Sequence, residues 1–194
     1  KGEPSVTDII AFENGKENEV LLNAAVAEKG SEHPLAEAIV QAAEKADIKI
    51  TNAETFEAVP GHGVKATFKG QALLLGNRRL MEQNKIDLKR PIESQLTKFE
   101  EQGKTAMLLA VDGKITGIIA VIDTPKENAA EAIQQLKTMG LEVAMLTGDN
   151  ERTAKAVASQ LDIDTVIANV LPWEKVNVIK KLQGEGKVVA MVGD

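Results

Sequence analysis

The first 115 residues of the chain alternate between two hydrophobic patterns. Short stretches with apolar residues at every second position indicate β-strands, and longer stretches with apolar residues three and four positions apart indicate α-helices. Glycines separate three short strands in the middle of this region, which is typical of an antiparallel meander. Further on, Asp112-Gly113 lies between apolar stretches at residues 106–111 and 115–122 and predicts a tight hairpin of these two strands. The expected strands cover residues 4–12, 55–59, 64–68, 73–75 and 106–111, and the expected helices cover residues 17–28, 34–46, 78–83 and 92–102.

Three apolar stretches in the rest of the chain each resemble a strand that leads to an aspartate, and segments with helical periodicity separate them. Such alternation of strands and helices predicts a parallel sheet. Ligands bind beyond the carboxyl ends of the strands in an open parallel sheet, so the three aspartates are expected to converge on one crevice. The strands cover residues 115–122, 141–146 and 187–192 and lead to Asp123, Asp149 and Asp194, and the helices cover residues 126–139, 150–160 and 173–183.

Composition excludes several classes of protein. A chain of 194 residues with 43% hydrophobic content can form one large domain or two small ones. A net charge of −6 argues against a general nucleic-acid-binding surface. Cysteine is absent and only two histidines occur, so disulfides and transition-metal centres are not expected, whereas carboxylates can still hold Mg²⁺. The longest apolar run, residues 115–122, is far shorter than the roughly 20 residues needed to cross a bilayer, and the N-terminus lacks a signal-peptide pattern.

The segment Met-Leu-Thr-Gly-Asp-Asn, which ends at Asn150, is the sharpest candidate site. A strand ends at glycine here and a helix begins at once, so Thr147 and Gly148 place a hydroxyl and backbone amides at a positive helix terminus, where phosphate binds readily. Asp149 or Asn150 could instead simply cap that helix. Asp194 at the next strand end favours the first interpretation, because two carboxylates with a phosphate between them make a Mg²⁺ site.

Four further positions are candidates with plain structural alternatives. His33, in Ser-Glu-His-Pro-Leu, could be an ordinary surface-loop residue, and the glycines of 61–64 and 76–77 could serve tight turns. The 61–66 segment also matches G-x-G-x-x-A, but no helix follows it, and the chain has no P-loop. Lys175 lies in the first turn of a helix, where a lysine opposes the helix dipole, so a catalytic role competes with a solvated surface lysine.

Taken together and in order, these motifs resemble the cytoplasmic ATP-binding region of heavy-metal P-type ATPases. The resemblance covers essentially the whole chain, and the Ser-Glu-His-Pro-Leu form looks most like the copper(I)-exporting branch. The set comprises Ser-Glu-His-Pro-Leu at 31–35, Gly-His-Gly-Val at 61–64, Gly-Asn-Arg at 76–78, Met-Leu-Thr-Gly-Asp-Asn at 145–150, Val-Leu-Pro-x-x-Lys at 170–175 and the terminal Val-Gly-Asp.

The resemblance implies an α/β fold with two parts. One is a haloacid-dehalogenase-like phosphorylation domain with a parallel sheet, incomplete in this chain. The other is an inserted α+β nucleotide-binding domain built on an antiparallel sheet flanked by helices. The expected division places residues 1–8 at the edge of the phosphorylation domain, residues 9–115 in the nucleotide-binding domain and residues 116–194 in the phosphorylation domain.

The resemblance also implies a reaction and a set of roles. ATP would sit in the inserted domain, and its γ-phosphate would pass to an aspartate, giving an aspartyl-phosphate whose turnover drives metal transport. By this similarity His33 would orient adenine and Glu28 would accept a hydrogen bond from its amino group, while the rest of the pocket would be formed by Gly61, Gly63, Val64, Gly76 and Asn77. At the phosphate end, Thr147 and Gly148 would bind the phosphoryl group, and Asp149 would steady the nucleotide and the hinge. Lys175 would offset phosphoryl charge and Asp194 would ligate Mg²⁺.

Two parts of the family pattern are absent from the 194 residues. The Asp-Lys-Thr-Gly-Thr segment that carries the nucleophile is missing, and the Gly-Asp-Gly-x-Asn-Asp motif is cut after Asp194. We therefore expect a fragment that binds ATP with Mg²⁺ but does not form the phosphoenzyme. In the parent protein it would lie at the cytoplasmic face of the cell membrane beside transmembrane and actuator domains, with no nucleic acid as partner.

Three alternatives remain open at the level of sequence. A zinc- or cadmium-exporting pump fits the same motifs, because the ion is selected elsewhere in such proteins. A soluble phosphatase of the same superfamily, with residues 9–115 as its cap, would also place acids at strand ends, and unchanged nucleotide binding in His33→Gln would favour it. A non-enzymatic, receiver-like acidic module would bind no nucleotide at all.

Overall fold

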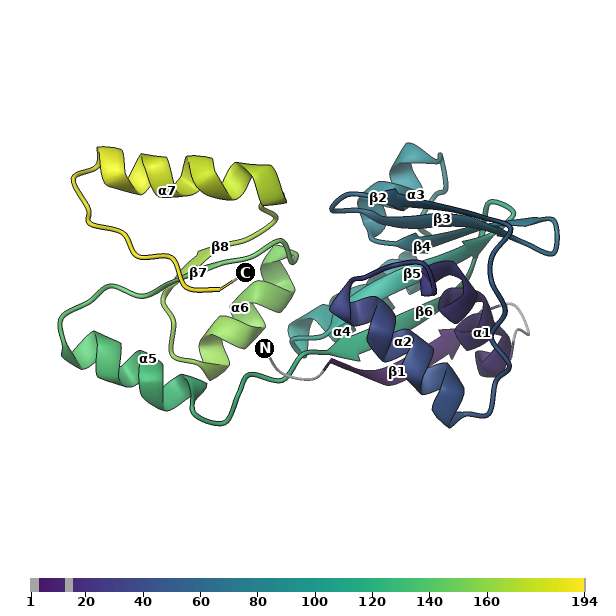
Figure 1. Cartoon of the computed structure of the whole chain (residues 1–194), viewed down its shortest axis with the longest axis horizontal. Helices are drawn as coiled ribbons and strands as arrows, with labels where there is room; N and C mark the ends of the chain where they lie inside the picture. The colour runs from purple at the N-terminus through teal and green to yellow at the C-terminus, as the bar shows by residue number, and fades with distance from the viewer. Residues whose placement is uncertain (1–3, 13–15, 194) are drawn as a thin grey trace.

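A computed structural model of the chain describes residues 4–12 and 16–193, and the structure is discussed for this part of the chain. It has two lobes, a larger one built on an antiparallel sheet and a smaller one that follows Ile122 (Figure 1). No helix in the described residues has the length and apolar character needed to cross a membrane.

The larger lobe contains a six-stranded sheet with the spatial order β1-β6-β5-β4-β3-β2, in which all neighbours are antiparallel. The predicted hairpin joins β5 to β6, and Asp112 (φ 48°) and Gly113 (φ 78°) both adopt the positive φ values that a two-residue turn of this kind requires. The strands are β1 (Ser5–Ala11), β2 (Thr55–Val59), β3 (Gly63–Phe68), β4 (Gln71–Gly76), β5 (Thr105–Val111) and β6 (Lys114–Ile122).

Helices cover both faces of the sheet, so its central strands are buried on both sides. Strand β5 shows this directly, because Met107 and Leu109 pack into one core with α1 and α2, whereas Leu108 and Ala110 pack into a second core with α3 and α4. Successive side chains of a strand point to opposite faces, which accounts for the alternation. The helices are α1 (Glu17–Glu28), α2 (Pro34–Lys45), α3 (Arg78–Gln83) and α4 (Arg90–Glu101).

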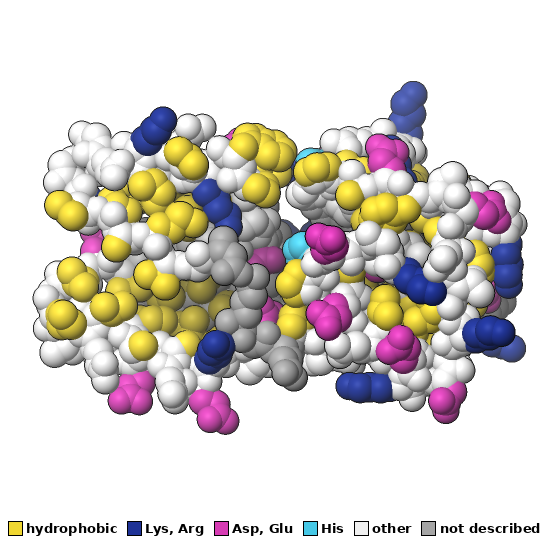
Figure 2. Space-filling model, in the orientation of Figure 1, with side chains coloured by type: hydrophobic (Ala, Val, Ile, Leu, Met, Phe, Trp, Pro, Cys, Tyr) yellow, Lys and Arg dark blue, Asp and Glu magenta, His cyan; other side chains and the backbone are white. Residues whose placement is uncertain are grey.

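The smaller lobe has a two-stranded parallel sheet, β7 (Ala144–Leu146) and β8 (Thr165–Ile167), with Met145 opposite Val166. Figure 2 shows hydrophobic side chains gathered on the surface of this lobe. Met139 and Trp173 are 73% and 60% exposed, so the smaller lobe buries its large apolar side chains less completely than the larger one. Its helices are α5 (Ala129–Thr138), α6 (Glu151–Gln160), the 3₁₀ turn η1 (Pro172–Glu174) and α7 (Lys175–Gly184).

The predicted fold class is confirmed, but two predicted parallel strands are wrong. Residues 115–122 belong to β6, which pairs antiparallel with β1 and β5, because a strand buried by helices on both faces is continuously apolar whichever direction its neighbours run. Residues 187–192 form no strand, and the described residues provide no neighbouring ladder for them. The expected boundaries at residues 9 and 115 fall inside β1 and β6, so a division after Ile122 keeps the sheet whole, and the domain division itself stays a prediction.

Candidate functional site

His33 begins α2 and caps it. Its backbone is extended (φ −76°, ψ 139°), and its Nδ1 accepts a hydrogen bond from the Leu35 amide at 3.2 Å, while Pro34 occupies the first helical position. This bond assigns the acceptor role to Nδ1, so the ring proton lies on Nε2. The ring itself is exposed, so it is both oriented by the helix start and accessible to a ligand.

Glu28, the last residue of α1, is a buried carboxylate with an unmet hydrogen-bonding requirement. It is 6% exposed, and its Oε2 has no hydrogen-bond partner among the described residues. Burial raises the pKa of the Glu28 carboxyl above its ordinary value, and a hydrogen bond with Ser31 offsets only part of this effect. The next turn leads directly to His33, because the Ser31 amide donates to the Glu28 carbonyl and the His33 amide donates to Ser31 Oγ. A buried acceptor of this kind suits a ligand donor such as an amino group.

The three candidate glycines lie where two backbone segments meet. Gly61 adopts φ +73° in the turn between β2 and β3, and Gly63 (φ +138°) faces Gly76 across the β3–β4 ladder. A Cβ atom on Gly63 would lie 2.1 Å from the Leu75 carbonyl oxygen, and one on Gly76 would lie 2.1 Å from the His62 carbonyl oxygen. The glycines at 63 and 76 are therefore required by the backbone itself, with or without a ligand.

Asn77 holds the same two turns together. Its Oδ1 accepts from the Leu80 amide at 3.1 Å and caps α3, while its Nδ2 donates to the Gly61 carbonyl at 2.9 Å. Its backbone amide donates to the His62 carbonyl at 2.9 Å. The structure thus brings Gly61, Gly63, Gly76 and Asn77 into one assembly, and Val64 beside it is only 4% exposed because it packs into the core shared with α1.

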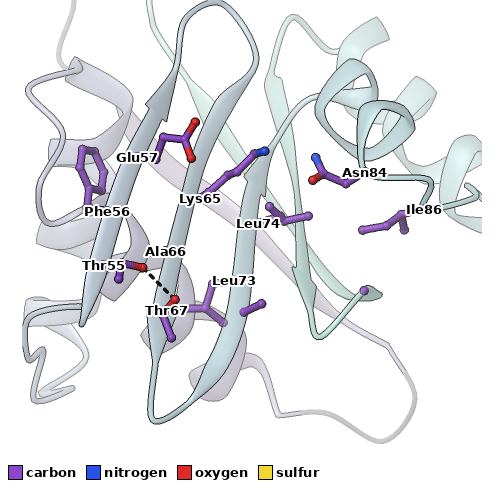
Figure 3. A pocket seen from close by; sticks show the side chains of 12 residues that line it. Thr55, Phe56, Glu57, Lys65, Ala66, Thr67, Leu73, Leu74, Asn84 and Ile86 are labelled. Carbon is purple, nitrogen blue, oxygen red and sulfur yellow. Dashed lines mark hydrogen bonds between the residues drawn. The ribbon is translucent and has the colours of Figure 1, made fainter.

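Helix α1, which ends at Glu28, and Val64 lie on the same side of the sheet. The loop after α1 meets β2, since a Cβ on Gly30 would lie 3.2 Å from the Phe56 ring. Phe56 is paired with Ala66, and Ala66 and Val64 belong to the core beneath α1 and α2. The hollow of about 590 Å³ in Figure 3 is lined mainly by residues of β2 to β4, among them Phe56, Lys65 and Ala66, and it contains none of the candidate residues.

The predicted phosphoryl loop, residues 147–150, is held in shape by its own polar groups. Thr147 Oγ1 donates to Asp149 Oδ2 at 2.8 Å, and the Asp149 amide donates back to Thr147 Oγ1 at 3.1 Å. Asn150 Oδ1 accepts from the Arg152 and Thr153 amides at 3.0 and 3.1 Å, so Asn150 is the cap of α6 and Asp149 is not needed for that purpose. The loop thus presents a hydroxyl, a carboxylate and the Gly148 amide at the start of a helix.

The structure shows fewer contacts for Lys175 and does not describe Asp194. Lys175 is the first residue of α7, directly after η1, and is partly exposed. Asp194 lies outside the described residues, so its expected role as a Mg²⁺ ligand stays a prediction. Among the described residues no three His, Asp or Glu side chains gather to hold a metal. The oxygen donors of Thr147 and Asp149 are nevertheless of the type that Mg²⁺ prefers.

Sequence reasoning missed the residues that join the two lobes. Thr105 Oγ1, at the start of β5, donates to Asp149 Oδ1 at 3.4 Å, and Thr153 Oγ1 donates to the Lys104 carbonyl at 3.0 Å. Glu100 on α4 is 1% exposed and also reaches the second lobe. A signal for Glu100 was present, because it follows Leu96 by four positions and so falls on the apolar face of its helix.

Comparison with known proteins places this geometry in a family. The model of haloacid dehalogenase-like hydrolases matches residues 1–194. Copper-exporting P-type ATPases of Staphylococcus aureus strains JH9 and MW2 are each 55% identical over 193 residues, which is 100% of this chain and 23% of theirs. The chain therefore spans about a quarter of the length of these relatives.

Solved structures agree with the sequence relatives. The catalytic domain of the CPx-ATPase CopB-B aligns with a TM-score of 0.76 at 26% identity, over 100% of this chain and 66% of that one. A zinc-transporting PIB-type ATPase in its E2.Pi state aligns with a TM-score of 0.61 at 34% identity, over 94% of this chain and 29% of that one. The chain belongs to the haloacid dehalogenase-like hydrolases and is homologous over its whole length to the catalytic region of copper-exporting P-type ATPases.

Proposed function

We propose that this chain is the ATP-binding part of the cytoplasmic region of a copper-exporting P-type ATPase, in which ATP hydrolysis proceeds through an aspartyl-phosphate. The observation that carries the proposal is the buried Oε2 of Glu28, which has no hydrogen-bond partner within residues 4–12 and 16–193, one turn before the exposed, oriented ring of His33. A buried acceptor without a partner costs about 1 to 3 kcal/mol, a cost that a bound donor removes. Adenine offers both the donor and the flat ring.

On the purine side each residue has a distinct task. The imidazole of His33, held through Nδ1, stacks against the adenine ring, and Glu28 accepts a hydrogen bond from the exocyclic amino group. Asn77 keeps the turn at Gly61 against the turn after β4, so the backbone can approach the nucleotide closely. The chain contains no tyrosine and its single tryptophan, Trp173, lies in the other lobe, and we assign the adenine ring to His33 because its exposed, oriented imidazole follows Glu28 in the same loop.

On the phosphate side the loop before α6 receives the triphosphate. The Thr147 hydroxyl and the Gly148 amide bind phosphoryl oxygens at the positive end of the helix, and Lys175 offsets their negative charge. The single hydroxyl proton of Thr147 is donated to Asp149 in this structure, so it turns to the phosphoryl oxygen when phosphate binds, while the Asp149 amide continues to hold the hydroxyl oxygen in place. Mg²⁺, when bound with Asp194 among its ligands, neutralises phosphate charge.

The parent protein determines the rest of the activity. We place this chain at the cytoplasmic face of the cell membrane, next to the transmembrane and actuator domains of the pump. Copper is favoured over zinc or cadmium as the transported ion because the relatives at 55% identity are copper exporters, whereas the zinc-transporting structure is 34% identical. The 194 residues contain no Asp-Lys-Thr-Gly-Thr segment, so this polypeptide binds ATP without becoming phosphorylated.

Calorimetry with ATP and GTP tests the proposal. ATP is expected to bind at least about tenfold more tightly than GTP, because guanine presents an acceptor where Glu28 requires a donor. His33→Gln should weaken ATP binding about tenfold through loss of ring stacking. Glu32→Gln is the matched control, since it changes an exposed neighbour with no assigned role, and it should leave ATP binding unchanged.

Four results would reject the proposal. Equal binding of ATP and GTP, or unchanged ATP binding in His33→Gln, would remove the adenine site and favour a soluble phosphatase. Incorporation of labelled phosphate from γ-labelled ATP into the polypeptide would show a nucleophile that the proposal does not contain. Absence of any nucleotide binding would favour the non-enzymatic acidic module.

A further inference from the structure

A single buried carboxylate lies at the junction of the two lobes. Glu100 is near the end of α4, and its side chain is 2% exposed. It binds two arginines, Arg78 from α3 and Arg152 from α6, and its Oε2 accepts from both, at 3.1 Å from Arg78 Nη2 and 3.2 Å from Arg152 Nη1. A carboxylate this deeply buried is retained only with such partners, because an unpaired charge in the interior is very costly.

Arg78 connects Glu100 to the nucleotide turn, by which we mean Gly61 to Gly63 and the Asn77 side chain that holds them. It is the first residue of α3 and directly follows Asn77, the residue that ties the turn at Gly61 to the start of this helix. Arg78 also donates through Nε to both carboxylate oxygens of Glu93, at 2.9 and 3.0 Å. Burial alone lowers the pKa of Arg78, but the hydrogen bonds and charges of Glu100 and Glu93 outweigh it and hold the pKa above its ordinary value.

Arg152 connects the same carboxylate to the phosphoryl loop. It lies in the first turn of α6, two residues after Asn150, whose side chain accepts from its amide. Two contacts flank the ion pair, one between Thr153 and the Lys104 carbonyl and one between Thr105 and Asp149. Figure 1 shows α4 and α6 facing each other where the lobes meet. The junction therefore runs from the loop at 147–150 to α4 without interruption.

Arg78 has more carboxylate partners and is less exposed than Arg152, so the contact between Arg152 and Glu100 is the one that can be released. The side chain of Arg78 is 31% exposed and is tied to two carboxylates, whereas that of Arg152 is 53% exposed and is tied to Glu100. Loss of the Arg152 contact returns a guanidinium to water and leaves Glu100 neutralised by Arg78. Opening of the lobes therefore leaves no unpaired buried charge, so its electrostatic cost is that of an exposed ion pair.

We propose that Glu100 is a positioning residue that couples the nucleotide turn at Asn77 to the phosphoryl loop at 147–150, with Arg152 as a releasable latch between the lobes. The inference rests on the proposed function only for the purpose of the latch, which is to hold the purine site and the phosphoryl site at the separation that one ATP molecule spans. The latch itself is a property of Glu100, Arg78 and Arg152, and it can be measured without nucleotide.

Distance measurement between spin labels tests the latch. The chain has no cysteine, so Glu44→Cys on α2 and Lys180→Cys on α7 introduce one label site in each lobe at exposed positions. The labelled parent should give one narrow distance distribution, and Arg152→Ala should broaden it and shift its mean. Arg152→Lys should restore part of the narrow component. The matched control is Lys155→Ala, which removes a cation from the same helix where the lysine pairs only locally with Glu151, and it should leave the distribution unchanged.

A second variant protects the test against a local effect of one arginine. Thr153→Val removes the hydrogen bond to the Lys104 carbonyl and should broaden the distribution in the same direction. Circular dichroism confirms that each variant is folded before its distances are compared. A distribution in Arg152→Ala that superimposes on that of the parent overturns the latch.

The same protein samples separate the two proposals. The affinities for ATP and for AMP are measured by calorimetry on the parent and on Arg152→Ala, and the ratio of ATP to AMP affinity should fall about threefold in the variant because the phosphates lose their positioned loop. No nucleotide binding in the parent would reject the proposed function while the label distances still decide the latch. A changed distance distribution with an unchanged ratio of ATP to AMP affinity would reject the coupling to the phosphoryl loop.

Discussion

Replacing Gly63 with alanine tests whether the close approach of β3 and β4 is a structural requirement. Gly63 lies opposite Gly76 in the ladder, and its φ of +138° is in a region that L side chains rarely adopt. The added methyl carbon would lie 2.1 Å from the Leu75 carbonyl oxygen and 2.6 Å from the Gly76 Cα, which are rigid backbone atoms. The two strands must therefore separate to accept it.

The expected loss of stability has two parts. Holding a non-glycine residue in this backbone conformation costs about 1 to 3 kcal/mol, and forcing overlapping atoms apart costs about another 1 to 3 kcal/mol. Together they predict a loss of about 4 kcal/mol. Gly70 provides the control, because it also has positive φ (+73°) but nothing lies within 4 Å of an added Cβ, so Gly70→Ala should cost only about 1 to 2 kcal/mol.

Urea unfolding followed by far-ultraviolet circular dichroism measures both variants. Tryptophan fluorescence is unsuitable, because Trp173 lies in the smaller lobe and does not report on the sheet. At about 2 to 4 °C per kcal/mol for a chain of this size, Gly63→Ala should lower the melting temperature by roughly 8 to 16 °C. Equal losses in Gly63→Ala and Gly70→Ala would refute the close approach of the two strands.

Two carboxylates, Glu28 and Asp8, are expected to change the stability of the fold with pH in opposite directions. Burial raises the pKa of Glu28 in the folded state, so its contribution to stability is fully present below the ordinary value of 4.5 and is lost as the pH rises through the folded pKa. Glu28→Gln should abolish this decline in stability. Urea midpoints that change in parallel in the parent and the variant from acid to neutral pH would contradict this expectation. Burial also acts to raise the pKa of Asp8, but hydrogen bonds from Lys104 and Thr7 and the charge of Lys104 outweigh it and lower the pKa below 3.8. The Asp8 contribution is therefore present above pH 3.8 and is lost as the pH falls through the folded pKa, and Asp8→Asn should cost at most about 1 kcal/mol at neutral pH because the pair is partly exposed. A variant that keeps the parent's full acid-induced loss in urea titrations would show that another carboxylate is responsible.

The local structure followed closely from the sequence because it depends on near neighbours. The predicted helices at residues 17–28 and 78–83 and the predicted strand at residues 55–59 match α1, α3 and β2. Asp112-Gly113 forms the expected hairpin. Turn residues, helix starts and hydrophobic periods act within about four positions, so a linear chain carries them in full.

The candidate site was accessible from the sequence only in part. The polar residues of the loop at 147–150 are contiguous, so their mutual hydrogen bonds could be anticipated, and the structure assigns the cap to Asn150. Glu28 gave no comparable signal, because its unpartnered oxygen becomes visible only when α1 is packed against the sheet. The position of Glu100 on the apolar face of its helix predicts its burial, but its two arginine partners come from distant parts of the chain.

The sequence by itself determined most of the strands and helices, although it did not predict β8 and wrongly predicted a strand at residues 187–192, and the ordered motifs determined the family. Only the tertiary structure decided the second neighbour of residues 115–122: the hairpin predicted their pairing with β5, whereas their pairing with β1 in place of a parallel strand came from the fold. It also decided that Glu100 receives an arginine from each lobe. The physical reason is the same in both cases. Periodicity is set by neighbours along the chain, whereas sheet partners and buried ion pairs depend on residues that are distant in sequence and meet only in the folded molecule.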